Sequence, residues 1–501
     1  MFLTEMKKTV EHTKIIAFQQ PLRPAPPEAI GPKEYKEYRE TLVEMDRILN
    51  AGIEQDFILK KMGHETHPPS GKIRNKYNNI RKAFRFVLLQ SLTGNSSREL
   101  SIRVSDSRLF SWFTSFDMTS KKGGSKSAID RYGKLFTQEE ITDLVHTINQ
   151  SVSEREQAQR LILENELDFS RHWVDSTCIK ADIHFPVDWV LLRDAARSLI
   201  GSIEVIRSHG LKHRIGNPQE FVRSMNALVM QFTHTGKKKN GKILRKKILR
   251  GMKRLLKKIE SHGHRYYELL DKNWQQSDLS RNQAQVILDR LANILSQVPP
   301  AIKQASDRII EGKKVDNACK ILSLYESDVH VLIRGKSGAA VEFGNGLYLS
   351  ENEDGLITDW QFIKEQPPGD NTLVEGSLER LNNHYGNIRS YTGDRGFHSK
   401  ENSELLEQEN IFNGICPKPV SELKIRLGER LFVKLQKRRA NTEARIGILK
   451  NKYIGKPLRS KGYKHRELRV GWSILTHNLW LLSSIAAENR RFEIETVWDV
   501  S

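Results

Sequence analysis

Apolar and polar residues alternate with two different periods along this chain. Between Lys33 and about Phe136, apolar residues recur every three or four positions, as in EYRETLVEMDRIL and IRKAFRFVLLQSL, which predicts helices. Between His172 and Ile183 the period shortens to two in WVDSTCIKADI, which predicts a strand. Helical spacing returns from about 189 to 320. The first two-thirds of the chain are therefore predicted to be largely helical, with one strand in between.

The remaining part mixes strands with helices. Three β-rich runs, VHVLIRG, AAVEFGNGLYLSE and GLITDWQFIKE, are separated by GKSG and NEDG turns, which is typical of an antiparallel meander. The chain then continues with a helix, the strand NIRSYTGD, a second helix, the short strand IFNGICP and one long helix from about Ser421 to Lys452. The run at 355–363 is either an additional edge strand or part of the central sheet. This order predicts an α/β fold, a mixed sheet flanked by helices as in ribonuclease-H-like folds.

The charge of the chain favours an anionic partner. The 501 residues carry a formal charge of +20, and the 81 Lys and Arg are spread along the sequence. Such an excess suits a phosphate backbone or an anionic membrane surface. No run approaches the roughly 20 apolar residues that span a bilayer, and MFLTEMKKTVEHTK lacks the apolar core of a signal peptide. We therefore expect a cytoplasmic, nucleoid-associated protein with no membrane partner.

One predicted helix concentrates this charge. Residues 237–258 include 12 Lys or Arg. An apolar stripe at helical spacing is formed by Leu244, Ile248, Met252, Leu255 and Ile259. The cations on the other faces should point away from the core and bind DNA phosphates, although a solvated charged face is the alternative. The candidate DNA-binding residues of this helix are Lys246, Arg250, Lys253, Arg254 and Lys257.

Three carboxylates lie where the predicted sheet and the last helix converge. Asp175 is on the first strand, Asp394 ends the strand NIRSYTGD, and Glu443 is on the final long helix. In-line cleavage of a phosphodiester needs charge neutralised at the attacking and leaving oxygens, which two Mg²⁺ or Mn²⁺ ions held by carboxylates can do. The isolated cysteines Cys178, Cys319 and Cys416 do not indicate a zinc site or a disulfide. We expect two such ions per site.

Glu443 is the one acid of the basic stretch KRRANTEARIGILK. It could be a solvated helix residue paired with Arg439 four positions earlier, or a capping residue. Alternatively it completes the metal site. Steps of four and seven residues return to nearly the same helix face, so Arg439, Glu443 and Lys450 would present cation, acid and cation in one stripe.

These motifs resemble those of DDE transposases of bacterial insertion sequences, whose signature around the last acid is Y-x2-R-x3-E-x6-K. Arg439, Glu443 and Lys450 occupy the R, E and K positions, while Gln436 replaces the tyrosine. WVDSTCIKADIHFPVD and YTGDRGF resemble the motifs of the first two acids in an unclassified branch that has a helical insertion after the first strand. KILSLYESDVHVLIRGKSGAAVEFG resembles the hairpin of that branch, with Arg334 in place of its first lysine. SSRELSIRVSDSRLFSWFTSFD and GWSILTHNLWLL resemble other shared segments, so the resemblance covers most of 90–485.

The resemblance implies a Mg²⁺-dependent transposase that cuts at insertion-sequence ends and joins the 3′ ends to target DNA. Asp175, Asp394 and Glu443 would be its catalytic metal ligands, and Arg439, Lys450 and Lys336 would contact DNA. Its partners would be terminal inverted repeats and target DNA, bound by a homodimer or a larger assembly. Two alternatives stay open: a ribonuclease-H-like DNA nuclease without strand transfer, and a catalytically decayed DNA-binding protein.

The same patterns suggest a division into domains. Residues 1–32 would be an N-terminal extension with a proline-rich linker, and 33–165 a helical DNA-binding domain. Residues 166–188 and 321–485 would form the ribonuclease-H-like catalytic domain, interrupted by the helical basic insertion 189–320. Residues 486–501 would be a C-terminal tail.

Overall fold

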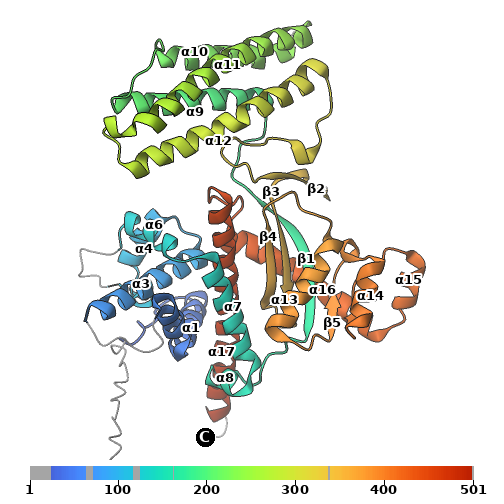
Figure 1. The fold of residues 1–501 in the computed structure, drawn as a ribbon. Helices are drawn as coiled ribbons and strands as arrows, with labels where there is room; N and C mark the ends of the chain where they lie inside the picture. Colours follow the sequence, from blue (N-terminus) through green and yellow to red (C-terminus); the bar gives the residue numbers. More distant parts are fainter. Residues whose placement is uncertain are drawn as a thin grey trace, which may run out of the picture. The chain divides into compact units, whose positions relative to one another are not determined.

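The chain folds into two compact units (Figure 1). The computed structural model describes residues 24–63, 71–116, 124–161, 163–237, 239–336 and 339–498. The first unit comprises Met1–Ser170, Asn352–Thr358 and Gly471–Ser501, and the second comprises Arg171–Glu351 and Asp359–Val470. Each unit therefore combines segments that are far apart in the sequence.

The first unit is built from helices, as the spacing of apolar residues predicts. Its helices are α1 (Lys33–Ile48), α2 (Glu54–Met62), α3 (Gly71–Thr93), α4 (Ser97–Asp106), α5 (Arg108–Thr114), α6 (Lys126–Tyr132), α7 (Gln138–Ser153), α8 (Arg155–Arg160) and the later part of α17 (Tyr463–Trp498). Capping boxes begin α4 and α7, where Ser96 with Glu99 and Thr137 with Glu140 satisfy free backbone amides. Aromatic side chains fill the core, and the ring of Phe84 lies 5.5 Å from that of Trp472.

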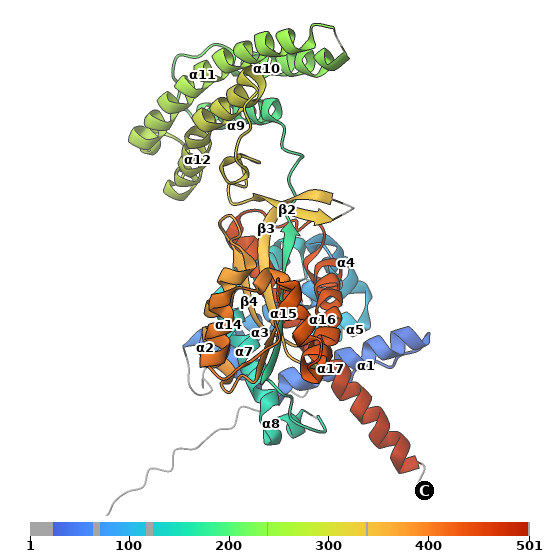
Figure 2. The ribbon, with the colours of Figure 1, turned by 90° about the vertical axis from the view of Figure 1, so that its right-hand side faces the viewer.

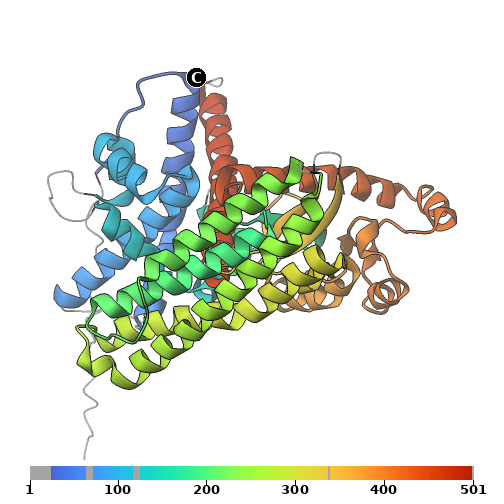
Figure 3. The ribbon, with the colours of Figure 1, turned by 90° about the horizontal axis from the view of Figure 1, so that it is seen from above.

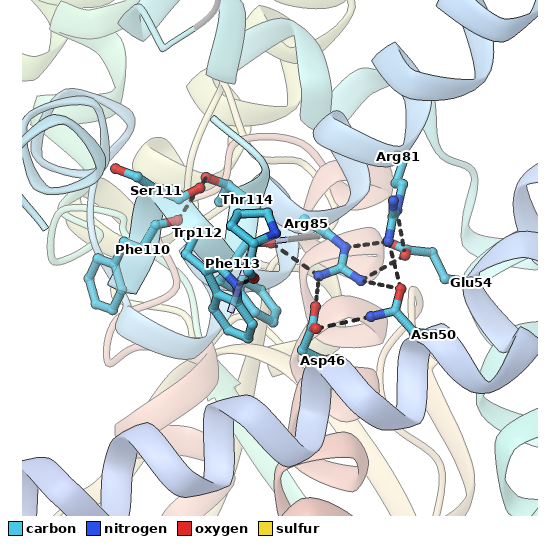
Figure 4. A network of polar contacts seen from close by, with 11 residues as sticks. Asp46, Asn50, Glu54, Arg81, Arg85, Phe110, Ser111, Trp112, Phe113 and Thr114 are labelled. Carbon is cyan, nitrogen blue, oxygen red and sulfur yellow. Dashed lines mark hydrogen bonds and ion pairs between the residues drawn. The ribbon is translucent and has the colours of Figure 1, made fainter. Parts of the chain in front are cut away.

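A buried ion network joins α1, α2 and α3 (Figure 4). The guanidinium of Arg85, 0% exposed, contacts the carboxylates of Glu54 and Asp46. Arg81 donates to Glu54 at 2.8 Å and to Asn50 at 2.6 Å. Burial alone would raise the pKa of Glu54, but Arg85 and Arg81 outweigh this effect and lower it below its ordinary value. The network thus compensates charges that burial would otherwise penalise.

The second unit is α/β and contains a six-stranded mixed sheet. Its strands are β1 (Arg171–Lys180), β2 (His330–Lys336), β3 (Ala339–Glu351), β4 (Ile357–Ile363), β5 (Ser390–Thr392) and β6 (Phe412–Asn413). The strand order is β2-β3-β1-β5-β6, and β4 also pairs with β3. β1 is antiparallel to β3 and parallel to β5. The longest strand, β3, therefore pairs with β1 and also forms the hairpin with β2 (Figure 2).

The helices of the second unit lie between its strands in the sequence or come after the last strand. They are α9 (Asp188–Ser208), α10 (Pro218–Thr233), α11 (Gly241–Asn273), α12 (Arg281–Ala305), α13 (Val374–Tyr385), α14 (Lys400–Gln408), α15 (Val420–Arg426) and α16 (Arg430–Ile448). The four long helices α9 to α12 separate β1 from β2 in the sequence and pack side by side (Figure 3). α9 contacts the other three, around a core of Leu, Ile, Met and aromatic side chains.

The two faces of β1 are covered by different helices. Asp175 shares one face with Trp173 and Thr177, because side chains alternate along a strand. This face contacts α16, where the indole Nε1 of Trp173 donates to the carbonyl of Leu435 at 3.0 Å. Val174 lies on the other face and belongs to the same buried cluster as Leu378 of α13.

The apolar stripe predicted on α11 is partly wrong. Met252 and Ile259 are buried as expected, but the residues buried beside them are Leu249 and Leu256. The predicted Ile248 and Leu255 are only partly buried at the edge of the core. The buried face continues through Gly263, Tyr266 and Leu270. Spacings of three and four from Leu249 onward fit a helix that packs against several neighbours.

The long helix expected from about Ser421 to Lys452 is interrupted. α15 ends at Arg426, and α16 begins at Arg430. The backbone amide of Gly428 donates to the carbonyl of Ile425 at 3.0 Å, which closes a turn between the two helices. After Ile448 the chain continues as a π-helical segment, Leu449–Ile454. Glu443 is therefore in regular α-helix, whereas Lys450 is in a wider turn.

Candidate active site

Asp175 stands in the middle of β1 on the face that contacts α16. Its neighbours on this face are Trp173, which is buried against α16, and Thr177. The carboxylate is partly buried, and its Oδ1 accepts the backbone N–H of Ser176 at 2.7 Å. The strand thus presents one acid between two side chains that face the helix.

Asp394 reaches the same place from the neighbouring parallel strand. Trp173 of β1 is in register with Thr392 of β5, so continuing the pairing by two residues sets Asp394 beside Asp175. The intervening Gly393 is close-packed, because a Cβ there would lie 3.1 Å from Cγ2 of Val174. Asp394 caps the short turn after β5, and its Oδ1 accepts the N–H of Gly396 at 2.7 Å.

The helix that carries Glu443 is tied to these strand ends by Gln436. The amide Nε2 of Gln436 donates to the carbonyl of Gly393 at 3.1 Å and to that of Gly414 at 2.6 Å. Together with the bond from Trp173 to Leu435, these contacts hold the first half of α16 against β1, β5 and β6. Gln436 stands where the signature that this stretch resembles has a tyrosine, and its side chain bonds to backbone carbonyls.

Glu443 lies seven residues beyond Gln436 on α16. Its side chain is 58% exposed, and Oε1 forms an ion pair with Nη1 of Arg439 at 2.8 Å. The pairing between positions i and i+4, raised above as an alternative for Glu443, is therefore present. Such an exposed pair is weak, so it leaves the carboxylate able to change partner.

Asp394 and Glu443 affect the charge of Asp175. The pKa of Asp175 is raised from its ordinary value to about 6, first by burial and also by repulsion from Asp394 and Glu443. The N–H of Ser176 and the guanidinium of Arg439 oppose this rise. Asp175, Asp394, Glu443 and Arg439 thus belong to a single charge cluster, drawn from two strands and one helix.

Carboxylate oxygens of this kind suit Mg²⁺ or Mn²⁺, and their mutual repulsion is the kind that a bound cation relieves. Among the described residues, however, no three His, Cys, Asp or Glu side chains are grouped closely enough to hold a metal ion as they stand. The donor chemistry fits a divalent ion, but the carboxylates do not form a finished coordination shell, and Glu443 is turned to Arg439.

The other residues predicted to contact DNA are placed differently. Lys450 donates from Nζ to the hydroxyl of Thr177 at 3.0 Å, two residues along β1 from Asp175. It therefore lies near the carboxylate cluster. Lys336 is the last residue of β2, and its side chain lies outside the described part of the structure.

The cations predicted on α11 divide into two groups. Arg250, Arg254 and Lys257 are exposed, whereas Lys246 and Lys253 are half-buried. The Nζ of Lys253 donates to the hydroxyl of Ser306 at 2.9 Å. The position of the buried stripe explains this difference, because Lys246 and Lys253 each lie three residues before a buried leucine, Leu249 or Leu256, and so share its side of the helix. The first three residues remain the better candidates for phosphate contacts.

Sequence reasoning missed Glu351, a buried carboxylate at the end of β3 that is 2% exposed. It accepts hydrogen bonds from Thr442, Arg438 and Arg445 of α16. A signal existed in the strand pattern, because GLYLSE places Glu351 at the alternate position after Leu347 and Leu349. An acid at an inward position of an apolar strand calls for a buried basic partner.

Comparisons with protein-family models, curated proteins and solved structures gave no match. The functional interpretation therefore depends on the residues and the geometry described above. Among the helices in the described ranges, none combines the length and hydropathy that crossing a bilayer requires.

Proposed function

We propose that the protein is a DNA transposase of the DDE type, with a ribonuclease-H-like catalytic domain. It would cut at the ends of an insertion sequence and join the freed 3′ ends to target DNA. The observation that carries this proposal is that β1, the end of β5 and α16, which bear Asp175, Asp394 and Glu443, are connected by strand pairing and by the hydrogen bonds of Trp173 and Gln436. The sheet supports it, because β1 lies between antiparallel β3 and parallel β5, the arrangement of ribonuclease-H-like sheets.

Asp175, Asp394 and Glu443 are the residues that would hold two Mg²⁺ or Mn²⁺ ions. When bound, such ions neutralise the attacking and leaving oxygens and lower the pKa of a bound water. The chain contributes a rigid frame, since Asp175 is within a central strand and Asp394 caps a close-packed turn. Arg439 supplies a planar guanidinium that suits a phosphate near the same carboxylates.

The positive charge of the chain accounts for DNA binding in this proposal. The net charge of +20 and the exposed cations Arg250, Arg254 and Lys257 on α11 favour a phosphate backbone. Terminal inverted repeats and target DNA would be the two substrates. Because two element ends must be joined together, the working form would be a homodimer or a larger assembly.

A strand-transfer assay tests this function. The parent protein, Mg²⁺, a plasmid target and a pre-cleaved duplex taken from the DNA flanking the coding sequence should give joined products. Asp175→Asn, Asp394→Asn and Glu443→Gln should each lower the rate by about 10³-fold, since a lost metal ligand costs the transition state about 4 kcal/mol. Asp182→Asn is the matched control, because this exposed acid just beyond β1 pairs with Lys461 instead.

The same assay separates the alternatives. Cleavage of the flanking DNA without joined products would instead indicate a ribonuclease-H-like nuclease. DNA binding with no metal-dependent chemistry, in the parent as well as in the three variants, would indicate a decayed DNA-binding protein.

A further inference from the structure

Glu351 lies on the sheet face that carries the carboxylate cluster. In the β1–β3 pairing it is directly opposite Trp173, and Leu349 is opposite Asp175. Directly paired residues project to the same face of a sheet, so Glu351 and Asp175 both face α16. Glu351 is thus a further carboxylate between the sheet and α16, and unlike Glu443 it is almost completely removed from solvent.

Both carboxylate oxygens of Glu351 are bonded to α16. Oε1 accepts from Nη1 of Arg438 and, at 2.8 Å, from the hydroxyl of Thr442, while Oε2 accepts from Nε of Arg445 at 3.3 Å. These three donors are spaced by four and three residues, so they form one face of the helix. The guanidinium of Arg438 also lies over the ring of Trp173, 4.5 Å from its centroid. The acid is therefore fully engaged in holding the helix.

We propose that Glu351 is a positioning residue for the catalytic centre, which fixes the rotation of the second half of α16 so that Glu443 faces Asp175 and Asp394. This inference rests on the proposed function. Thr442 is the direct neighbour of Glu443, so a bond to its hydroxyl sets the direction in which Glu443 projects. Gln436 fixes the first half of the helix, and Glu351 fixes the half that bears the acid.

A buried ion pair suits this task better than an apolar contact does. Charge-assisted hydrogen bonds are directional, whereas packed aliphatic side chains tolerate small rotations of a helix. A buried carboxylate also has no water to replace a lost partner, so an alternative position of α16 would leave its charge uncompensated. The buried ion pair thus favours a single position and rotation of α16 on the sheet.

The second unit offers a matched control for a test. Asp359, 3% exposed, forms a two-bond ion pair with Arg380 of α13, with both bonds at 2.8 Å. α13 packs on the opposite face of the sheet from α16, in the cluster that contains Val174. Asp359→Asn therefore removes a similarly buried acid from its ion pair without touching the helix that carries Glu443.

The test measures Mn²⁺ binding to full-length protein without DNA, by the loss of the free-ion electron paramagnetic resonance signal. We expect Glu351→Gln to weaken Mn²⁺ binding at least tenfold and Asp359→Asn to leave it unchanged. Thr442→Ser should keep the parent affinity because it retains the hydroxyl, and Thr442→Val should weaken it. Thermal melts of the same samples confirm that each variant is folded at the temperature used.

The outcomes are distinguishable. Equal Mn²⁺ affinity in the parent, Glu351→Gln and Thr442→Val would overturn the positioning role while leaving the proposed function intact. A parent that does not bind Mn²⁺, or binds it equally well after Asp175→Asn, would overturn the proposed metal site and this inference with it. Equal weakening by Glu351→Gln and Asp359→Asn would assign Glu351 a general structural role instead.

Discussion

Gln436 shows how a single side chain can connect the parts of this site. Its amide carries two N–H protons, and each is directed at a backbone carbonyl, one of them in Gly393 next to Asp394. A tyrosine hydroxyl has only one proton to donate, so the tyrosine of the transposase signature could not make both bonds. Gln436 therefore links a helix to two strand ends.

Replacing Gln436 should therefore destabilise the second unit. Gln436→Ala removes the side-chain donor from the buried carbonyl of Gly414 and leaves that of Gly393 with only the backbone amide of Cys416. We expect the free energy of unfolding to fall by about 1–3 kcal/mol. The free energy of unfolding of Gln436→Glu should fall at least as far, because a carboxylate would face the same carbonyl oxygens. Equilibrium urea unfolding measures the effect. Lys437 is an exposed neighbour of Gln436 on α16, so Lys437→Ala should change the free energy of unfolding little. A stability for Gln436→Ala equal to that of the parent would show that water replaces these bonds.

The acids of the candidate site were accessible to sequence reasoning, whereas the residues that hold them were not. Asp175 and Asp394 stand in or after strand patterns, and Glu443 stands at fixed spacing from Arg439. The roles of Gln436 and Glu351 depend on carbonyls and guanidinium groups that only the fold brings near. Side chains that bond to distant backbone leave no local pattern in a sequence.

At the scale of elements, the exposed face of α11 is the clearest surface for a polyanion. Arg250, Arg254 and Lys257 follow one another at spacings of four and three residues and are all exposed. Lys253 lies between them in sequence but is bonded to Ser306. The packing of the helix therefore decides which of its basic side chains are exposed and which are held by neighbouring residues.

Removing the three exposed cations should weaken DNA binding in a salt-dependent way. Each phosphate contact contributes about 0.9 to the slope of log affinity against log salt, so the triple alanine variant should lower the slope by about 2 to 3. Fluorescence anisotropy with a duplex between low and moderate salt measures it. A charge-matched control replaces the exposed lysines Lys303, Lys313 and Lys314 by alanine. Equal slopes in both triple variants would mean that net charge, and not this face, binds DNA.

The local pattern of apolar and polar residues predicts most helices and strands. It does not predict where they end or which of their faces is buried. The interruption at Gly428 divides a helix whose spacing looks continuous, because a single turn can be closed by residues of ordinary helical preference. On α11, apolar residues occupy adjacent positions such as Ile248 and Leu249, so two stripes fit the sequence. Only contact with α9, α10 and α12 selects the one that is buried.

The whole molecule depends on contacts between distant segments. The carbonyl of Ile357 accepts from the amides of Asn149 at 3.0 Å and Asn478 at 2.9 Å, which assembles three parts of the first unit. Residues 352–358 and 471–485 therefore belong with the N-terminal helices, although the sequence analysis groups them with the sheet. No period or composition marks such a boundary, because it is set by partners more than 100 residues away.

Two separately packed units should unfold in two transitions, and only the first unit should respond to titration of Glu54. The pKa of Glu54 is lowered in the folded state, so its stabilising contribution is complete above the unfolded-state pKa of about 4.3 and is lost as the pH falls through the folded value. Hydrogen exchange followed by mass spectrometry between about pH 5 and 3 should show protection lost in α3 before α12. Glu54→Gln should be less stable at neutral pH, since Arg85 and Arg81 lose a buried counter-charge, yet its α3 protection should depend less on pH. An unchanged pH dependence in this variant would assign the acid sensitivity to other carboxylates.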